Sequence, residues 1–150
     1  MRALIQRVSS ANVCVNEIEV ANIAHGLLVL LAVEMADEEV DIIWLANKII
    51  KLRVFDDANN VPNLSVNDVQ GQLLVVSQFT LYASTKKGNR PSYVKAAMPD
   101  KALLHYQSFL TTIAKLTSTK VQAGLFGANM KVQLVNHGPL TLIIDSKNKE

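Results

Sequence analysis

The sequence predicts an α+β fold with a mixed, mostly antiparallel sheet and two main helices. Short segments rich in β-branched residues recur along most of the 150 residues, which is typical of a sheet with several strands. Two segments, 40–52 and 99–116, instead carry apolar residues at helical spacing. We find no internal repeat and no linker, so residues 1–150 are expected to form a single domain.

The first part of the chain is predicted to be extended. Residues 2–8 alternate loosely between apolar and polar side chains and form a first strand. β-Branched residues on both sides of Asn16 and Glu17 indicate a hairpin. Residues 27–33 are continuously apolar, which is the pattern of a strand that is buried on both faces.

Each predicted helix has a recognisable start. Residues 37–39 are all acidic, and the helix dipole favours acidic side chains at a helix N-terminus. The apolar stripe that follows is wide, which predicts packing on the sheet and on a further surface. The second helix is predicted to start at Pro99 and Asp100, with Asp100 as the N-cap.

The remaining segments are predicted to be short strands and turns. Residues 53–55 read as a short strand before the turn chemistry of 56–60. The polar tail 146–150 is expected to fray. Further strands are expected at 73–76, 121–124, 131–135 and 140–144.

Composition excludes several classes of protein. Hydrophobic residues make up 49% and charged residues 19%, which argues against disorder. The longest apolar run, 27–33, is far shorter than the ~20 residues that span a bilayer, and no signal pattern opens the chain. We therefore expect a soluble, cytoplasmic protein. The single cysteine cannot form an internal disulfide or a thiolate metal cluster. A net charge of +2 is too small to indicate a nucleic-acid partner by itself.

The most informative stretch is 73–83, where an apolar run turns polar without a turn signal. Ser77, Gln78 and Thr80 surround one aromatic residue, and buried polar groups need partners. The residues alone leave two interpretations open. The stretch is either a strand end whose polar groups bond to neighbouring backbone, or a ligand site at the mouth of a sheet.

Several motifs in order connect the chain to a known family. Residues 77–83 read SQFTLYA, and residues 136–141 read NHGPLT, which fits an N-x-G-P-x-T pattern. The sequence thereby resembles the D-aminoacyl-tRNA deacylases, and the resemblance covers essentially the whole chain. Further matching segments lie at 1–8, 26–31, 90–93 and 124–130.

The resemblance implies a barrel-like sheet with helices outside, assembled as a homodimer. It implies an enzyme that hydrolyses the ester of D-aminoacyl-tRNA and of mischarged glycyl-tRNA, with the acceptor end of tRNA as partner. No cofactor, DNA or membrane partner is expected. Two alternatives are a tRNA-binding module without hydrolytic activity and a dimer that binds a generic small ligand.

The resemblance also assigns a catalytic turn to Ser77, Gln78, Phe79 and Thr80. Backbone N–H groups near Gln78 and Phe79 would hold the ester carbonyl, while Ser77 and Thr80 fix the turn. No activating base is evident beside Thr80, so the resemblance assigns activation of water to the ribose hydroxyl adjacent to the ester.

Five other residues match family positions that bind or select the substrate. Gly138 and Pro139 would exclude L-aminoacyl groups from the partner's pocket, with Arg7 supporting their turn. Phe126 and Met130 correspond to residues that line the site of the terminal adenosine. From the residues alone, core packing is the ordinary interpretation of Phe126 and Met130, and a surface charge that of Arg7.

The charged and metal-ligating residues complete the expectations. His25, His105 and His137 are scattered without carboxylates at ligand spacing, so no metal site is expected. His137 stands where the family usually has Asp. Lys86, Lys87 and Arg90, together with Lys95, lie in or just after a polar loop and are candidates for weak contacts with tRNA phosphates.

Overall fold

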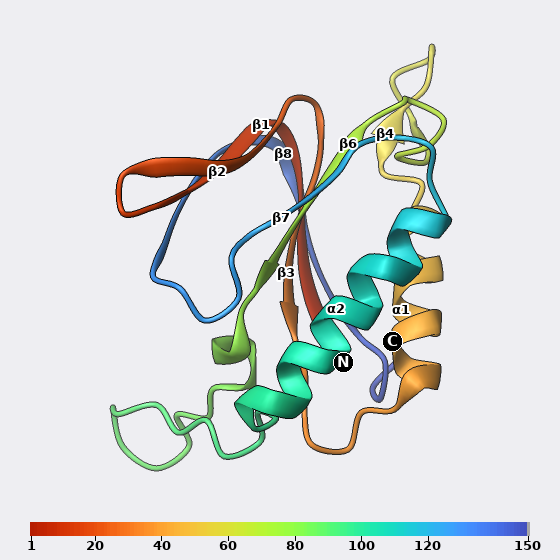
Figure 1. Ribbon diagram of the computed structural model, residues 1–150. Helices are drawn as coiled ribbons and strands as arrows, with labels where there is room; N and C mark the ends of the chain where they lie inside the picture. The colour runs from red at the N-terminus through yellow and green to blue at the C-terminus, as the bar shows by residue number, and fades with distance from the viewer. Residues whose placement is uncertain (150) are drawn as a thin grey trace.

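The computed structural model describes residues 1–149, which form two helices, a six-stranded sheet and a separate two-stranded pair (Figure 1). The strand order is β2-β1-β3-β6-β7, and β8 also pairs with β1. The sheet contains β1 (Arg2–Val15), β2 (Ile18–Ile23), β3 (Gly26–Ala32), β6 (Gln72–Ser77), β7 (Val121–Ala123) and β8 (Met130–Asp145). The other elements are α1 (Glu39–Ile50), β4 (Phe55–Asp56), β5 (Pro62–Leu64), the 3₁₀ helix η1 (Phe79–Tyr82) and α2 (Pro99–Lys115).

The predicted fold class is confirmed: the chain is α+β, with a barrel-like mixed sheet and two helices packed outside it. β1 pairs antiparallel with β2, β3 and β8, whereas β3–β6 and β6–β7 are parallel. Both helices cover the same side of the sheet (Figure 1). Among residues 1–149, no helix is both long and apolar enough to cross a membrane.

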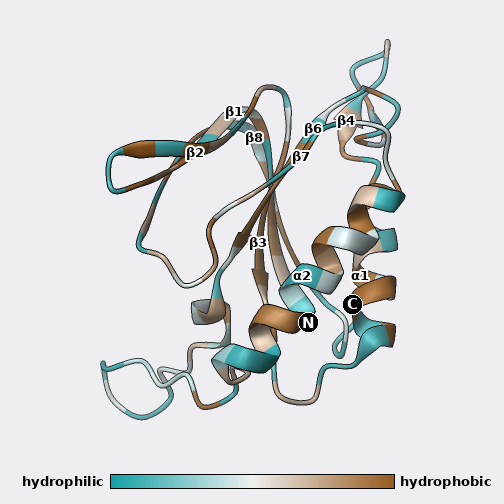
Figure 2. Cartoon of the chain, viewed as in Figure 1, coloured by the Kyte–Doolittle hydropathy of each residue, from teal (hydrophilic) through white to brown (hydrophobic). Residues whose placement is uncertain are grey.

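Strands β3 and β6 are buried on both faces, as their continuous apolar runs predict. Leu27 and Val29 belong to the cluster beneath the helices, which includes Leu45 of α1 and Phe109 of α2. Leu28 instead joins a second cluster under the β1–β2 hairpin. Figure 2 shows the hydrophobic colouring along these central strands.

The start of β3 requires glycine. A Cβ atom at Gly26 would lie 1.9 Å from the carbonyl oxygen of Gln72. This close approach brings the two parallel strands together and aligns their ends. In this register Leu31 pairs with Ser77, where the candidate site begins.

The first strand is longer than predicted, because residues 2–15 form one continuous strand instead of two. Its first half pairs with β3 and its second half with β2, while β8 runs along its other edge. The predicted hairpin turn is confirmed. Asn16 and Glu17 have φ angles of 50° and 64°, the positive values that a tight two-residue turn of type I′ requires.

Strand β8 is also a single strand, where two were predicted. Gly138 and Pro139 do not end it, because the irregularity is absorbed in the pairing with β1. The register shifts between Gln6 and Val8 and again between Val8 and Ser10. Irregularities of this kind bend a strand and re-aim its side chains.

The helix starts differ in how well they were predicted. Glu38 caps α1 in a capping box with Asp41, in agreement with the acidic segment 37–39. The prediction of Asp100 as the N-cap of α2 is wrong. Met98 is the N-cap and Pro99 occupies the first helical position, where its fixed φ and missing N–H are favourable.

The carboxyl-terminal tail is ordered at its start, contrary to the predicted fraying. Ser146 is buried, accepts a hydrogen bond from the Met1 amino group at 2.6 Å and donates to Asp41 at 2.7 Å. Burial alone would raise the pKa of Asp41, but hydrogen bonds from Lys147 and Ser146 lower it to about 2. Of the predicted tail, Glu150 lies outside the described residues.

Candidate active site

The polar segment 77–80 forms a sharp turn at the end of β6. The backbone N–H of Gln78 donates to the carbonyl of Leu31 at 2.7 Å, which continues the parallel pairing by one residue. The chain then enters η1 at Phe79. The side-chain amide of Gln78 donates to the hydroxyl of Thr80, which braces the turn. A strand end with a local polar network is therefore present in this stretch, and the ligand-site interpretation stays a prediction.

The amides at this turn differ from those the family resemblance implied. The Gln78 N–H cannot hold a substrate carbonyl, because the pairing of β6 with β3 uses it. The N–H groups of Phe79 and Thr80 have no hydrogen-bond partner among residues 1–149, because they open a helix that has no preceding turn. The free donors therefore lie one residue further along the chain than expected.

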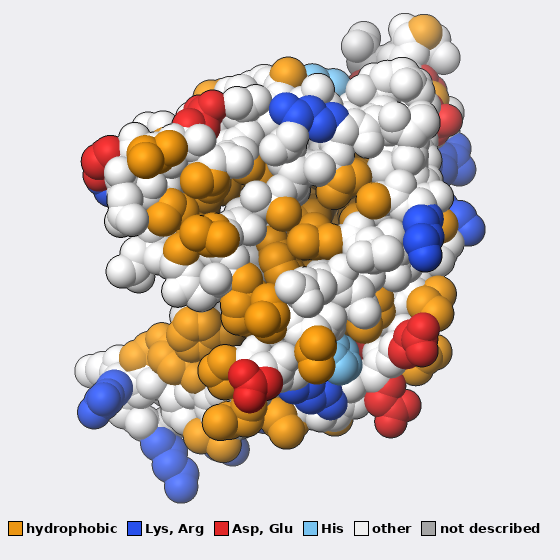
Figure 3. Space-filling view, viewed as in Figure 1, with side chains coloured by type: hydrophobic (Ala, Val, Ile, Leu, Met, Phe, Trp, Pro, Cys, Tyr) orange, Lys and Arg blue, Asp and Glu red, His pale blue; other side chains and the backbone are white. Residues whose placement is uncertain are grey.

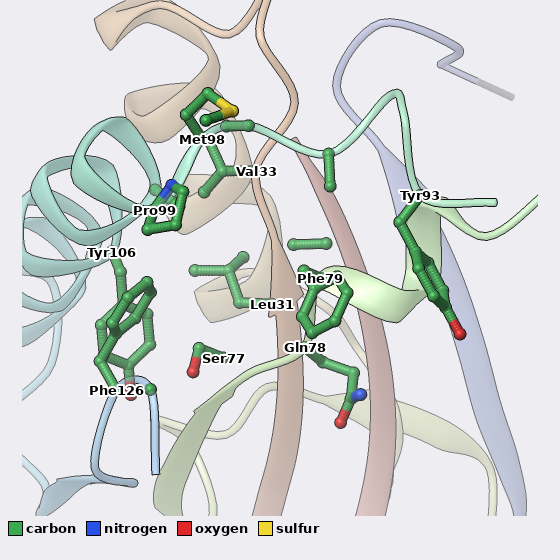
Figure 4. A pocket seen from close by; sticks show the side chains of 15 residues that line it. Leu31, Val33, Ser77, Gln78, Phe79, Tyr93, Met98, Pro99, Tyr106 and Phe126 are labelled. Atoms are coloured by element: carbon green, nitrogen blue, oxygen red, sulfur yellow. The ribbon is translucent and has the colours of Figure 1, made fainter.

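A cavity of about 430 Å³ opens above this turn (Figure 4). Ser77, Gln78 and Phe79 line it, while Thr80 does not. The other walls come from the end of β3, the segment that leads into α2, the first half of α2 and the loop after β7. Most of these residues are apolar. They are Leu31, Ala32, Val33, Tyr93, Ala96, Ala97, Met98, Pro99, Ala102, Tyr106, Phe126 and Gly127.

Phe126 stands in the wall of the cavity against Tyr106. Their ring centroids are 5.7 Å apart with the planes at 42°. Tyr106 is buried, and its hydroxyl donates to the carbonyl of Val75 at 2.8 Å and lies 3.4 Å from that of Gly124. Burial raises the pKa of Tyr106 to about 12. Tyr106 thus fixes the base of the loop that presents Phe126.

Gly138 and Pro139 lie elsewhere, on β8, and do not line this cavity. Both are exposed, and the peptide bond between them is cis. Arg7 supports the segment from β1: its Nε donates to the carbonyl of His137 at 3.1 Å and its Nη2 to that of Gly138 at 3.3 Å. Within one chain, the Gly-Pro segment and the turn at 77–80 are therefore separate.

Arg7 is not the surface charge that its position in the sequence suggested. It is only 5% exposed, and its Nη1 donates to the carbonyl of Val54 at 2.7 Å. Asp56, which is 38% exposed, lies 3.4 Å from the same nitrogen. The guanidinium therefore ties β8 to the end of the segment that follows α1.

Met130 does not reach the cavity. It is half-buried against the hydrophobic cluster under the hairpin, and a Cβ atom at Gly124 would lie 2.7 Å from its sulfur. The core-packing interpretation describes its position, and direct contact with a substrate in this cavity is not supported. Met130 instead packs on the residue at which the Phe126 loop begins.

Lys86, Lys87 and Arg90 lie on an exposed loop beside the cavity. The loop is closed at its base by two backbone hydrogen bonds between Ser84 and Ser92, of 2.8 and 2.9 Å. Lys and Arg side chains project from this part of the surface, at the lower left of Figure 3. No acidic residue within 1–149 forms an ion pair with these three cations.

None of the three histidines lines the cavity. His105 faces the 33–37 segment, with its ring nitrogens 3.1 and 3.2 Å from the carbonyls of Lys101 and Asp37. His25 and His137 lie near each other beside the Gly-Pro segment, with ring centroids 6.3 Å apart. Burial, then His137 and then Arg7 lower the pKa of His25.

The sequence did not mark several residues of the cavity as functional. The helical spacing of apolar residues in 99–116 includes Tyr106 and correctly predicts its burial, but it gives no sign of a role for the hydroxyl. Tyr93 stands out in the sequence only as part of segment 90–93, which matches the family. The run Ala96-Ala97-Met98-Pro99 was available as a signal, since small residues before a helix allow a ligand to approach closely.

An apolar cavity next to a turn with two unpaired amide donors, of which Phe79 lines the cavity and Thr80 follows it, resembles the arrangement by which enzymes bind an acyl group. Comparison with known proteins identifies the class more narrowly. The family model of D-Tyr-tRNA(Tyr) deacylase matches residues 4–145. D-aminoacyl-tRNA deacylases of Flavobacterium johnsoniae and Flavobacterium psychrophilum are 57% and 56% identical over the full length of both chains.

Solved structures agree on the fold. One titled c-Myc DNA Unwinding Element Binding Protein is 36% identical, with a TM-score of 0.92 over 97% of this chain and 98% of that chain. A probable eukaryotic D-amino acid tRNA deacylase is 16% identical, with a TM-score of 0.83 over 95% and 97%. The chain belongs to the D-aminoacyl-tRNA deacylase family and is a hydrolase that acts on carboxylic esters.

Proposed function

We propose that the cavity holds the aminoacyl-adenosine end of D-aminoacyl-tRNA, with the ester carbonyl on the N–H groups of Phe79 and Thr80. The observation that carries this proposal is the pair of unpartnered amides at the turn after Ser77, where Phe79 lines the cavity and Thr80 directly follows it. Preorganised donors of this kind stabilise the oxyanion that forms when water adds to an ester. The whole chain, 1–150, would act as one cytoplasmic catalytic domain.

Activation of water falls to the substrate in this proposal. The hydroxyl of Thr80 lies outside the cavity wall and accepts from Gln78, and no histidine lines the wall. The free hydroxyl of the terminal ribose is adjacent to the ester and can position or activate water. Water then adds to the carbonyl carbon, the bond to the ribose oxygen breaks, and that oxygen leaves with a proton.

Selection of handedness would come from a second copy of the chain. Gly138 and Pro139 are exposed and form no part of the cavity wall of their own chain, so they are available to enter another subunit's cavity. The same strand exposes apolar side chains that suit a homodimer interface: Leu134, Val135, Leu142 and Ile143.

There the carbonyls of Gly138 and Pro139 would accept from the substrate ammonium and crowd the position that an L side chain needs. The Gly138 oxygen already accepts from Arg7 at 3.3 Å, but a carbonyl has two lone pairs. A pocket that rejects the L enantiomer by steric clash needs few specific contacts with the side chain of the D enantiomer. Glycine, which has no side chain, would therefore be removed from tRNA as well.

The remaining parts of the tRNA end have candidate sites. Phe126 offers a ring for the terminal adenine, since aromatic side chains stack bases well. Met130 would support the Phe126 loop from behind. Lys86, Lys87 and Arg90 would contact phosphates of the acceptor end with little sequence preference. We infer no DNA partner and no cofactor for this reaction.

The test of this proposal is multiple-turnover release of the amino acid from D-aminoacyl-tRNA by the purified protein. We expect many moles of free D-amino acid per mole of protein and little release from the L-aminoacyl form. Tight binding of charged tRNA without release of amino acid would contradict the mechanism and favour a binding module instead.

Replacing Thr80 by alanine should leave most of the deacylation rate. An unassisted threonine hydroxyl is a poor nucleophile, and the change removes only one hydrogen bond of the turn. We expect a fall in kcat of no more than about tenfold, the effect of roughly 1.4 kcal/mol. A loss of several thousand-fold in a folded variant, or an acyl adduct on Thr80 found by mass spectrometry, would contradict substrate-assisted catalysis.

A further inference from the structure

An exposed pair of aromatic rings stands at the open side of the cavity. Phe79 and Tyr93 meet edge to face, with ring centroids 5.1 Å apart and planes at 74°. Both line the cavity, yet 55% of Phe79 and 38% of Tyr93 is exposed. In Figure 4 the two rings lie on the opposite side of the cavity from Phe126 and Tyr106.

The segment that carries Tyr93 is strongly basic. Residues 84–95 contain four Lys or Arg side chains and no Asp or Glu. The bonds between Ser84 and Ser92 close the loop, which places Tyr93 directly after its base. Exposed aromatic rings next to unpaired cations are the combination that binds single-stranded nucleic acid, through stacking and phosphate contacts.

We propose that Phe79 and Tyr93 form a stacking platform for the unpaired bases that precede the terminal adenosine of the tRNA, with Lys86, Lys87, Arg90 and Lys95 along their phosphates. This inference rests on the proposed function, because it places the aminoacyl-adenosine in the adjoining cavity. Stacking is tolerant of sequence, so the platform serves tRNAs that differ in body and amino acid. It holds the strand while the ester lies at the Phe79 and Thr80 amides.

The kinetic test compares two substrates and three variants. Tyr93→Ala should raise KM for D-aminoacyl-tRNA about tenfold with kcat unchanged, because the loss of one stacked base has an effect of this order on binding. KM for D-aminoacyl-adenosine, which lacks the preceding nucleotides, should rise much less, by no more than the loss of one apolar wall contact. Tyr93→Phe should restore the wild-type KM. Val94→Ala is the matched control, since Val94 is 87% exposed beside Tyr93 and does not line the cavity.

A second readout does not depend on turnover. Uncharged tRNA with 2-aminopurine next to the terminal adenosine should lose fluorescence on binding to the wild-type protein, and much less on binding to Tyr93→Ala. An equal rise in KM for both substrates in Tyr93→Ala, or unchanged fluorescence quenching in that variant, would overturn the platform. If the wild-type protein hydrolyses neither substrate, the proposed function fails, while quenching still decides whether the platform exists.

Discussion

Gly138→Leu should lower kcat/KM for D-aminoacyl-tRNA by about 100-fold, the cost of a displacement of roughly 1 Å at a reacting centre. The expected loss arises outside the mutated chain. A Cβ atom at Gly138 would meet only the side-chain oxygen of Asn136, at the ordinary contact distance of 3.4 Å. The first carbon of the new side chain therefore causes no clash in its own subunit, and we expect the side chain to obstruct the substrate bound in the partner.

Two controls separate this effect from misfolding. Light scattering should give twice the 16.5 kDa chain mass for both wild type and variant, and the two Tm values should agree closely. Gly88→Leu is not a suitable control because Gly88 has a φ of 78°, which strains a side chain. Val135→Ala, on the same strand, tests the interface separately. A folded, fully active monomer would refute a site shared between subunits.

Arg7→Met should cost both stability and activity. The guanidinium is 5% exposed and donates to the carbonyls of Val54, His137 and Gly138. Methionine retains part of the apolar volume but leaves those acceptors without their donor, at about 2–4 kcal/mol in the free energy of unfolding. The Gly-Pro segment also loses its anchor, so we expect kcat/KM to fall by about 100-fold.

Urea denaturation and initial-rate kinetics check both parts of this prediction. Arg53→Met is the matched control, since Arg53 is exposed and donates to one carbonyl, that of Asn63 at 2.9 Å. Its effect on stability should stay within about 0.5 kcal/mol. If Arg7→Met matches Arg53→Met in both measurements, Arg7 has no role in holding the Gly-Pro segment.

Local patterns of the sequence predicted most of the elements. Apolar periodicity located α1 and α2, and continuous apolar runs located β3 and β6, because burial on one or two faces leaves a direct trace in residue order. The division of β8 into two strands was wrong for a physical reason. Gly138 and Pro139 are ordinary strand breakers, but the register shifts against β1 accommodate them.

The site was less accessible to local reasoning. The motifs at 77–80 and 136–141 drew attention to the right segments, but long-range contacts decide what their atoms can do. Only the pairing with Leu31 shows that the Gln78 amide is occupied. Only the packing of Met130 against the hairpin cluster shows that its side chain stays outside the cavity. Burial of Arg7 likewise follows from three segments distant in sequence.

The proposed enzyme rejects L-aminoacyl groups by sterics and does not grip the D side chain. The most direct measurement is kcat/KM on one tRNA body charged with D-tyrosine, D-alanine, glycine or L-tyrosine, corrected for spontaneous hydrolysis. Steric rejection predicts kcat/KM values within about tenfold of one another for D-tyrosine, D-alanine and glycine, a spread of roughly 1.4 kcal/mol. It predicts no hydrolysis of the L-tyrosyl ester above background. Refusal of glycine with a strong preference for D-tyrosine, or hydrolysis of the L-tyrosyl ester, would contradict it.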